Sequence, residues 1–427
     1  MSTPQEFDLI VVGGGLAGAS LVAALRGSGL RIAVVERWPL EHDKQPSYDD
    51  RTVALTWSAR RIYEGIGVWS AISGEAEPIR DIHVSDRGGF GMTHLSHRHA
   101  GTPALGYVVP TRILGGALLA SMESADSVTL YCPARATELR VTGDRGHLAL
   151  EQNGQTVNLS APLVVVADGG RSDLAGGEDS HPKPYPQQAL LSIVTTDRPH
   201  RGRAWERFTG EGPLAMLPLS GNRLAVVWTS MPKNLASRQA MDDDGFVLHL
   251  QRTFGDRAGN LERPSARKAY PLHRSHLRHP ARDRRVVLGN AAHTVHPVAG
   301  QGFNLGLRDV AVLAELVFRA RLAGRDIGSE VLLQEYNDLR RRDTFMVRQF
   351  THSMVTLFCA DLPGARLARN LGLKGVELFP PAKRFLLRRT MGLAGPLGLL
   401  ARGLPLDCLA AGGGDYAGPP ENGAAGP

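Results

Sequence analysis

The 427-residue sequence predicts an α/β fold with a Rossmann-like domain of parallel strands, an inserted antiparallel-sheet domain and C-terminal helices. Three observations predict this arrangement. Continuous apolar runs at 9–12 and 163–166, and the segment 284–288 that ends in Val-Val-Leu, are typical of strands buried in a parallel sheet. The segment 190–229 instead alternates between apolar and polar residues, as antiparallel strands do. Beyond residue 304 the pattern is mostly helical.

The first strand runs directly into Gly13, Gly15 and Gly18, which have the spacing G-x-G-x-x-G. The first glycine permits a tight turn, the second lets the backbone approach a pyrophosphate, and the third lets the following helix pack close to the strand. A second strand, at 31–35, ends in Glu36, where a carboxylate can bind a ribose 2′-OH. Strand, glycines, helix, strand and acid in this order predict a dinucleotide-binding site.

Composition excludes several other classes of protein. The net charge of +7 is modest for this length, and no nucleic-acid-binding motif accompanies it, so we expect no nucleic-acid partner. Cys132, Cys359 and Cys408 are too far apart in sequence for a C-x-x-C redox pair or a disulfide framework. We see no signal peptide and no apolar run long enough to span a bilayer, so we expect a cytoplasmic protein.

The next part of the chain alternates between short strands and helices. We expect a helix at 58–63, strands at 79–84 and 106–110, and a helix at 111–122 that is capped by Thr111. Four further strands between 128 and 159 form a predicted meander.

Two candidate groups of polar residues lie in or beside this part. Arg51 and Arg112 each precede or begin a helix and could pair with a cofactor phosphate or be surface charges. His94, His97 and His99 lie in a predicted loop, and we favour a solvated or substrate-side loop over a metal site because no carboxylate or cysteine cluster joins them.

Two later segments complete the predicted site. The strand at 163–166 is followed by Asp168-Gly169, and the strand at 284–288 opens into a glycine-rich loop at 289–306. A helix is expected from about 304 to 322, and its N-terminus can present backbone N–H groups to an anionic ring edge. No second G-x-G-x-x-G follows a strand, which argues against a separate NAD(P)H domain.

The C-terminal region is basic. Leu386, Leu393, Leu397 and Leu400 would share a helical face, opposite arginines, although Pro396 must kink or break the helix. The stretch 383–402 therefore either docks on a membrane surface or packs on the body of the protein. The tail 411–427 is rich in Gly, Pro and Ala and is expected to be disordered.

The predicted domains follow from these patterns. We expect a discontinuous nucleotide-binding domain at 1–75, 105–180 and 280–325, and a substrate domain at 76–104 and 181–279. A helical region at 326–410 and the tail at 411–427 follow.

Two motifs point to a family. Residues 296–309 read His-Pro-Val-Ala-Gly-Gln-Gly-Phe-Asn-Leu-Gly-Leu-Arg-Asp, and residues 212–218 read Gly-Pro-Leu-Ala-Met-Leu-Pro. Together with the first glycines, they make the chain resemble the FAD-dependent aromatic hydroxylases of the para-hydroxybenzoate hydroxylase fold over about residues 8–350. Within that family it is similar to the ubiquinone-biosynthesis hydroxylases, and most of all to the 2-polyprenyl-6-methoxyphenol hydroxylases.

The resemblance implies an FAD site. In the family the first glycines hold the pyrophosphate, the acid holds a ribose, Asp-Gly lies by the FAD and is implicated in NAD(P)H use, and the last loop holds the ribitol and the ring. The family usually has Gly-Asp where this chain has Gly289-Asn290, and an amide can still accept a hydrogen bond from a ribitol hydroxyl. The expected FAD contacts are Gly13, Gly15, Gly18, Glu36, Arg37, Arg51, Arg112, Asp168, Gly169, Asn290, Pro297, Gly300, Gly302, Phe303 and Asn304.

The activity that the resemblance implies is hydroxylation of a prenylated phenol in ubiquinone biosynthesis, with NAD(P)H as reductant and O₂ as oxygen donor through a flavin C4a-hydroperoxide. Because the cofactor carries the hard step, no side-chain nucleophile is needed. His293, His296 and Pro297 are the candidate catalytic residues, and a loop-structuring role is the alternative for the two histidines.

Other functions and partners stay open. One alternative is a sister hydroxylase that acts at another ring position or on another aromatic compound. A non-catalytic flavoprotein that holds quinone intermediates is a second. The expected partners are a ubiquinone-biosynthesis protein complex and the inner face of the membrane, which the protein would bind peripherally.

Overall fold

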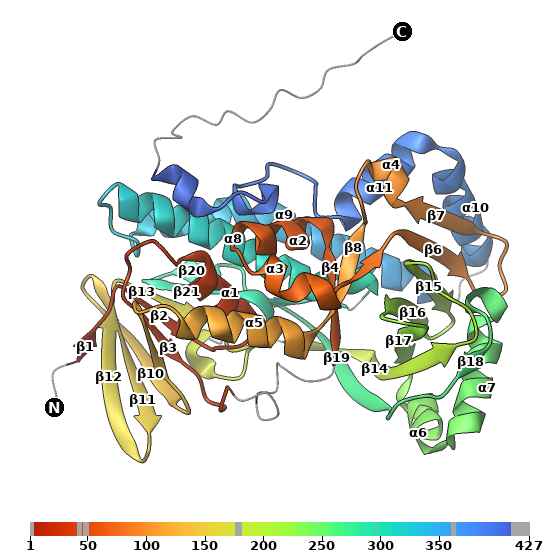
Figure 1. Cartoon of the computed structure of the whole chain (residues 1–427), viewed down its shortest axis with the longest axis horizontal. Coiled ribbons are helices and arrows are strands. Elements are labelled where there is room, and N and C mark those ends of the chain that lie inside the picture. Colours follow the sequence, from red (N-terminus) through yellow and green to blue (C-terminus); the bar gives the residue numbers. More distant parts are fainter. Residues whose placement is uncertain are drawn as a thin grey trace, which may run out of the picture.

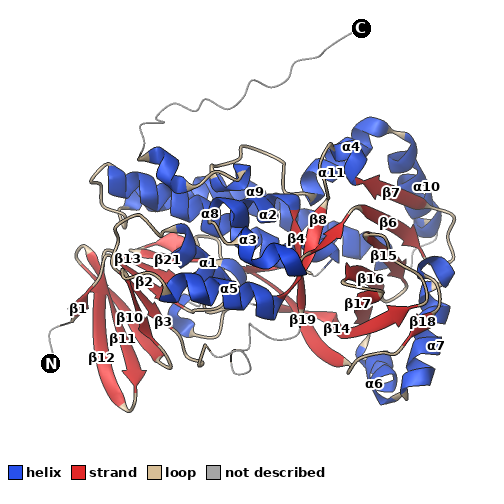
Figure 2. Cartoon of the chain, viewed as in Figure 1, coloured by secondary structure: helices blue, strands red, loops and turns tan. Residues whose placement is uncertain are grey.

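The computed structural model describes residues 4–40, 45, 51–175, 182–296, 298–359 and 364–410, without the side chains of Ala299 and Cys359. The predictions made for Pro297 and for the tail 411–427 lie outside the described residues. Two lobes lie side by side along the long axis, and the long helices α8 and α9 run beside them (Figure 1). Figure 2 shows that each lobe is built on strands with helices packed around them.

A six-stranded sheet forms the centre of the first lobe, in the order β20-β21-β13-β2-β3-β9. All its neighbouring strands are parallel except β20 and β21. Every residue of β2, β13 and β3 is buried, as the apolar runs predict. The bounds are β2 Leu9–Val12, β3 Ile32–Val35, β9 Val128–Tyr131, β13 Leu163–Val166, β20 Ala281–Arg282 and β21 Arg285–Val287.

Helices cover one face of this sheet and a second sheet covers the other. The helices are α1 (Leu16–Ala24), α5 (Thr111–Glu123) and α8 (Gln301–Leu322), and their apolar side chains form the largest core with β2 and β13. The second sheet has the order β1-β12-β11-β10. Its strands are β1 Gln5–Glu6, β10 Arg135–Thr142, β11 Arg145–Gln152 and β12 Gln155–Ala161.

The predicted meander is therefore wrong in one strand. Residues 135–161 do form three antiparallel neighbours. Val128–Tyr131, however, pairs in parallel with β3 and is the edge strand of the six-stranded sheet. Two of the four residues in this edge strand are exposed, which gave it the appearance of a meander strand.

The second lobe contains a nine-stranded sheet in the order β22-β19-β14-β17-β16-β15-β6-β7, with β18 paired to β14. It is antiparallel, as predicted, except that β15 and β6 are parallel. Apolar side chains on one face pack against α6 (Pro232–Ala240) and α7 (Asp243–Phe254). The bounds are β6 Asp81–Asp86, β7 Met92–Ser96, β14 Lys183–Thr196, β15 Arg203–Thr209, β16 Gly212–Leu219, β17 Arg223–Ser230, β18 Leu261–Glu262, β19 Lys268–His276 and β22 His293–Thr294.

A small sheet in the order β4-β8-β5 lies where the two lobes meet (Figure 1). Its strands are β4 Thr52–Thr56, β5 Glu77–Ile79 and β8 Gly106–Pro110. The single strand predicted at 79–84 is thus wrong, because the chain changes sheets at Arg80. The predicted first helix is α2 (Trp57–Gly65), and α3 (Trp69–Ile72) follows it.

Two local predictions also need correction. Thr111 does not cap α5, because its hydroxyl donates to the main-chain oxygen of Arg51 and Pro110 occupies the N-cap position without a side-chain hydrogen bond. The histidines predicted in a loop lie instead in β7 and in α4 (His97–Ala100). Within the described part of the chain, no group of three or more His, Cys, Asp or Glu residues could hold a metal ion.

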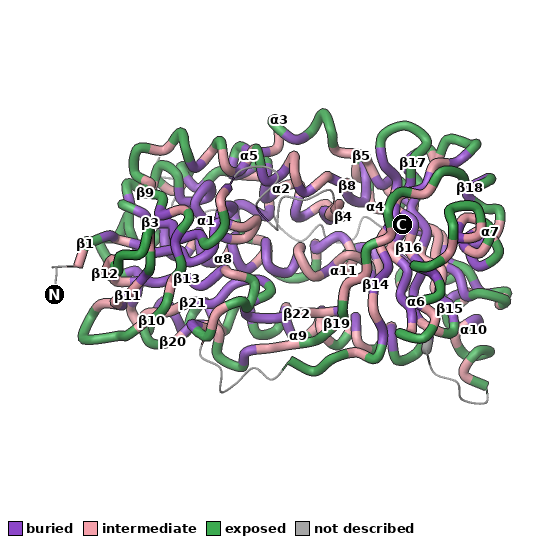
Figure 3. Tube along the Cα trace, turned by 90° about the horizontal axis from the view of Figure 1, so that it is seen from below, coloured by how far each residue is buried: buried purple, intermediate pink, exposed green. Residues whose placement is uncertain are grey.

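Three helices follow α8, namely α9 (Glu330–Cys359), α10 (Ala365–Leu378) and α11 (Pro380–Thr390). Of the two alternatives for 383–402, the positions of the leucines favour packing on the body of the protein. Leu386 and Leu393 pack against a cluster that contains Leu387 and Met391, and Leu400 is fully buried. The buried segments run through both lobes, whereas α10 is largely at the surface (Figure 3). Across the described ranges, no helix has the length and apolar character needed to cross a membrane.

Candidate functional site

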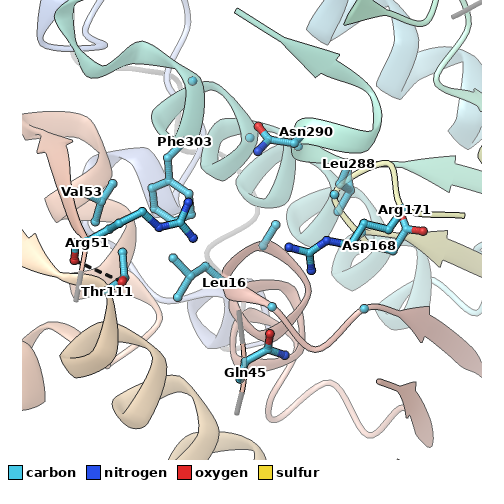
Figure 4. Close-up of a pocket in the computed structure, with 18 of the residues that line it drawn as sticks. Leu16, Gln45, Arg51, Val53, Thr111, Asp168, Arg171, Leu288, Asn290 and Phe303 are labelled. Atoms are coloured by element: carbon cyan, nitrogen blue, oxygen red, sulfur yellow. Dashed lines mark hydrogen bonds between the residues drawn. The ribbon is translucent and has the colours of Figure 1, made fainter. Parts of the chain in front are cut away.

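A cavity of about 310 Å³ opens where the strands of the first lobe end. It is lined by the glycine turn after β2, by Asp168 and Gly169 after β13, and by Arg51 and Val53. Gly289, Asn290, Gly302, Phe303 and Gly306 line it from the last loop and α8. Figure 4 shows side chains from all these segments around one space, with Phe303 and Asn290 on one side and Leu16 and Gln45 on the other. Ligands of open parallel sheets bind at this edge, beyond the carboxyl ends of the strands.

The glycines of the first turn are required by close contacts between main chains. Gly13 has φ +106°, and a Cβ there would lie 2.6 Å from the carbonyl oxygen of Ala167. A Cβ on Gly18 would lie 1.9 Å from the carbonyl oxygen of Gly13. Gly15 is the N-cap of α1 and lines the cavity, so the first N–H groups of this helix can bind an anion in the cavity.

Glu36 is held by the turn that it faces. Its Oε2 accepts a hydrogen bond of 2.6 Å from the N–H of Gly14, and its Oε1 accepts one of 2.8 Å from the N–H of Trp38. Each oxygen of an ionised carboxylate can accept more than one hydrogen bond, so a ribose hydroxyl can still donate to either. The fold thus orients this carboxylate before any ligand binds.

A second cavity, of about 420 Å³, adjoins the first and shares Gly13, Glu36, Asp168 and Arg171 with it. It is also lined by Arg37, whose guanidinium lies 5.3 Å from the centre of the Trp38 ring. The two cavities together form an elongated site with Glu36 between its ends. This shape suits a dinucleotide with its ribose at Glu36.

Asp168 contributes an unsatisfied polar atom to both cavities. Its Oδ1 accepts a hydrogen bond of 2.9 Å from the N–H of Gly170. Its Oδ2 is buried and has no hydrogen-bond partner among the described residues. Buried polar atoms are nearly always paired in native proteins, so this oxygen indicates a ligand that donates a hydrogen bond.

The start of α8 closes the other side of the site. The helix was expected to begin near residue 304 but begins at Gln301, after Gly300 in a left-handed conformation with φ +61°. Gly302 and Phe303 in its first turn line the cavity. The side chain of Asn304 is used within the protein, since its amide donates to the oxygens of Ala54 (2.7 Å) and Gly300 (2.6 Å). Main-chain N–H groups of this turn are therefore the groups that a ligand can use.

The remaining predicted FAD contacts do not all line the cavity. Arg51 lines the cavity, and its guanidinium lies 5.3 Å from the centre of the Tyr270 ring. Gly169 and Asn290 also line it. Arg112 is half-buried at the start of α5, directly after Thr111, which lines the cavity, and its contact with FAD stays a prediction.

The two candidate catalytic histidines are buried and make contacts within the protein. His293 Nε2 lies 2.5 Å from Asp309 Oδ2, and Arg340 Nε donates to the other oxygen of Asp309 at 2.7 Å. Burial alone would raise the pKa of Asp309, but His293 and Arg340 lower it to about 2. His296 packs edge-on against Tyr185, and burial lowers the pKa of its imidazole to about 4, so it is neutral at pH 7. These contacts favour the loop-structuring role for both.

Several lining residues escaped the sequence analysis, among them Leu16, Gln45, Val53, Thr111 and Arg171. Arg171 follows Asp168 by three residues, so its place after a buried strand was a usable signal. Gln45 and Val53, which lies in β4, reach the cavity from segments that have no motif of their own. Only the fold brings them to the site.

Comparison with known proteins decides the family. Residues 6–351 match the model of the FAD binding domain family. The chain is 39% identical to the ubiquinone hydroxylase UbiL of Rhodospirillum rubrum over 410 residues, which cover 95% of each chain. The chain belongs to this family of FAD-binding hydroxylases. It is also 32% identical to the 3-demethoxyubiquinol 3-hydroxylase of Escherichia coli, over 92% of this chain and 100% of that protein.

Solved structures agree on the fold of this FAD-binding hydroxylase. It superposes on the p-nitrophenol 4-monooxygenase PnpA of Pseudomonas putida with a TM-score of 0.76 at 18% identity, covering 92% of this chain and 100% of that chain. For PqsL of Pseudomonas aeruginosa, a probable FAD-dependent monooxygenase, the TM-score is 0.71 at 21% identity, and the coverages are 87% and 100%. The predicted fold class is thereby confirmed.

The residues of the hydroxylase fit FAD. The first turn of α1 and Glu36 suit its pyrophosphate and a ribose, and the unpaired Oδ2 of Asp168 suits a hydroxyl donor. The N-terminal turn of α8 suits the electron-rich edge of the isoalloxazine ring. The fit to FAD thus depends on main-chain N–H groups and on the carboxylates of Glu36 and Asp168, and each of these contacts can be tested by mutation.

Proposed function

We propose that this protein is an FAD-dependent monooxygenase that hydroxylates a polyprenyl-methoxyphenol ring in ubiquinone biosynthesis. The overall reaction converts a ring C–H into C–OH: one oxygen atom of O₂ enters the ring, the other leaves as water, and NAD(P)H supplies two electrons. Bound FAD would carry those electrons and activate O₂. The observation that carries the proposal is the FAD-shaped site in a chain that matches ubiquinone hydroxylases along almost its whole length.

The residues of the chain have three tasks in this function. The glycine turn and Glu36 hold the dinucleotide, with the pyrophosphate near the N-terminus of α1. The α8 turn presents N–H groups where negative charge develops on the ring system, which is the electrostatic contribution of a pre-arranged site. The lobe that contains the nine-stranded sheet lies beside the first lobe (Figure 1) and would shield the reacting ring from water.

A membrane contact is part of the proposal, because a prenylated phenol partitions into the bilayer. The leucines first assigned to this contact face inward. Leu378, Phe379 and Phe385 are instead exposed at the junction of α10 and α11, and the guanidinium of Arg389 lies 5.4 Å from the centre of the Phe385 ring. Exposed apolar side chains beside cations suit an anionic lipid surface.

The proposal is tested with a strain that lacks the gene for this protein. The expected result is an accumulated quinone precursor that lacks one ring hydroxyl, and the missing position identifies the step. Complementation should require the FAD site, so Gly15→Val should fail. A precursor that lacks a hydroxyl at another position would indicate a sister hydroxylase. Rescue by a variant that cannot bind FAD would indicate a scaffold without catalysis.

A further inference from the structure

One row of side chains crosses the central strands of the nine-stranded sheet. Glu206 on β15 pairs with Ala215 on β16, Ala215 pairs with Val227 on β17, and Val227 pairs with Leu191 on β14. Directly paired residues of neighbouring strands project to the same face of a sheet. Glu206 also pairs with Val84 on β6, so it is the one acidic residue in a row that is otherwise apolar from Val84 to Leu191.

This face of the sheet is turned towards the FAD cavity. Ala189 lies two residues before Leu191 on β14 and so projects to the same face. It pairs with Tyr270 on β19, whose ring lies under the guanidinium of Arg51, a residue that lines the cavity. The opposite face, which carries Trp228, is covered by α6 and α7.

The middle of the row lies between two hydrophobic clusters. Ala204, two residues before Glu206, belongs to one hydrophobic cluster, and Phe208, two residues after it, belongs to another and stacks on Phe358. Between these clusters Leu191, Ala215 and Val227 are only partly buried, and they belong to none of the clusters found in the described part of the chain. Apolar side chains left between two packed clusters are available to an apolar ligand.

Glu206 lacks a partner in this setting. Its Oε1 is buried, and no described residue forms a hydrogen bond with it. The neighbouring Arg207 projects to the other face, where its Nε donates to the main-chain oxygen of Thr253 at 3.2 Å. Burial raises the pKa of Glu206 to about 8, so the carboxyl group is mostly protonated at pH 7. A neutral carboxyl group can donate one hydrogen bond and accept others, which suits a hydroxyl group.

We propose that Glu206 is a substrate-binding residue that hydrogen-bonds a hydroxyl group on the aromatic ring, while Leu191, Ala215 and Val227 contact the ring itself. The proposal rests on the function proposed above and adds the residue that selects a free phenol. A buried group that must pair with a hydroxyl rejects an analogue that lacks it far more strongly than an apolar wall could. Glu206 thus discriminates between a phenol and its methyl ether.

The test uses the FAD-loaded, full-length protein. A short-chain prenylated phenol and its O-methyl ether are each titrated, and the change in visible flavin absorbance gives the two dissociation constants. Wild type should prefer the phenol by about tenfold or more. Glu206→Leu and Glu206→Met should bind the phenol about tenfold more weakly and the ether as before. Glu206→Gln, which keeps a donor and an acceptor, should retain most of the preference.

The controls separate the possible failures. Glu262→Leu, at an exposed acid of β18 in the same sheet, should behave as wild type. The proposal for Glu206 is overturned if the Leu or Met variant keeps the preference for the phenol, or if both variants lose FAD. If wild type binds neither compound, the proposed function fails as well. If wild type prefers the phenol and the variants do too, only the role of Glu206 fails.

Discussion

The carboxylate of Glu36 accepts a hydrogen bond of 2.6 Å from the main-chain N–H of Gly14, in the middle of the glycine turn. Glu36, which is proposed to bind the ribose, therefore also stabilises the glycine turn that is proposed to bind the pyrophosphate. This hydrogen bond connects the proposed ribose site with the proposed pyrophosphate site. A change at either one should affect the binding of both parts of the ligand.

Removal of this carboxylate should release FAD. We expect Glu36→Ala to raise the dissociation constant of FAD more than about tenfold, because a hydrogen bond to a charged group is worth about 1.5–3 kcal/mol. Flavin fluorescence during titration of the apoprotein measures this constant. Glu138→Ala, at an exposed acid that pairs with Arg140, is the control and should bind FAD as wild type does. Equal affinities in Glu36→Ala and wild type would refute the ribose contact.

A substitution of Gly18 tests whether α1 must pack closely against the turn that follows β2. Because a Cβ at this position would lie 1.9 Å from the carbonyl oxygen of Gly13, Gly18→Ala should displace the turn. The expected losses are about 1–3 kcal/mol in the free energy of unfolding and weaker FAD binding. Gly116→Ala is the matched control, since its Cβ would meet no atom within 4 Å on α5. That variant should be unchanged or slightly more stable, and chemical denaturation measures both.

The next prediction concerns Asn290, which occupies the position where the resemblance to the aromatic hydroxylases leads us to expect Asp. If its side chain accepts a hydrogen bond from the ribitol of FAD, Asn290→Asp should keep FAD. Asn290→Leu should bind it more weakly by about 1–3 kcal/mol, because a polar group of the ligand loses its partner. Titration of the apoproteins with FAD gives the comparison. Unchanged affinity in Asn290→Leu would mean that the side chain makes no contact with the cofactor.

The buried pair of His293 and Asp309 predicts an acid-sensitive fold. The pKa of Asp309 falls from an ordinary value of 3.8 to about 2, so the folded state favours the ionised form. The stability that this carboxylate contributes is complete above about pH 4 and is lost as the pH falls towards 2. Asp309→Asn should lower the free energy of unfolding by about 3–5 kcal/mol at pH 7 and reduce the acid dependence in this window. An unchanged acid transition would contradict this assignment.

The exposed junction of α10 and α11 predicts weak binding to anionic vesicles. The double variant Leu378→Ser with Phe379→Ser should reduce co-sedimentation with vesicles that contain phosphatidylglycerol, because both side chains are largely exposed. Val331→Ser, which changes an exposed apolar residue on α9, is the control. If the double variant and the control sediment equally, the membrane contact lies elsewhere or does not exist.

Local sequence patterns predicted the parts of the site that are contiguous in the chain. Gly13, Gly15, Gly18 and Glu36 lie within one strand–helix–strand unit, where spacing determines geometry. The buried strands were equally clear because all their residues are apolar. The edge strand Val128–Tyr131 was misplaced, since an exposed edge has the same mixed pattern as a meander.

Residues that meet only through tertiary structure were missed. Gln45 and Arg171 approach the cavity from separate connections. Glu206 follows Trp205 and precedes Arg207, and a single acid in an alternating strand looks like part of a solvated face. The strand registers show instead that it lies on the face of the sheet opposite α6 and α7. For the leucines of 383–402 the sequence left membrane docking and packing on the body open, because the pattern of a helical face does not identify the neighbour that covers it.

The most direct test of the proposed reaction is to follow the oxygen atom. The purified, FAD-loaded protein is incubated with NAD(P)H, a short-chain prenylated methoxyphenol and ¹⁸O₂, and the product is analysed by mass spectrometry. Hydroxylation predicts one new ring hydroxyl that carries a single ¹⁸O atom, with consumption of NAD(P)H that depends on the phenol. A product whose new hydroxyl carries no ¹⁸O, or a phenol recovered unchanged by a protein that holds FAD, would contradict the proposal.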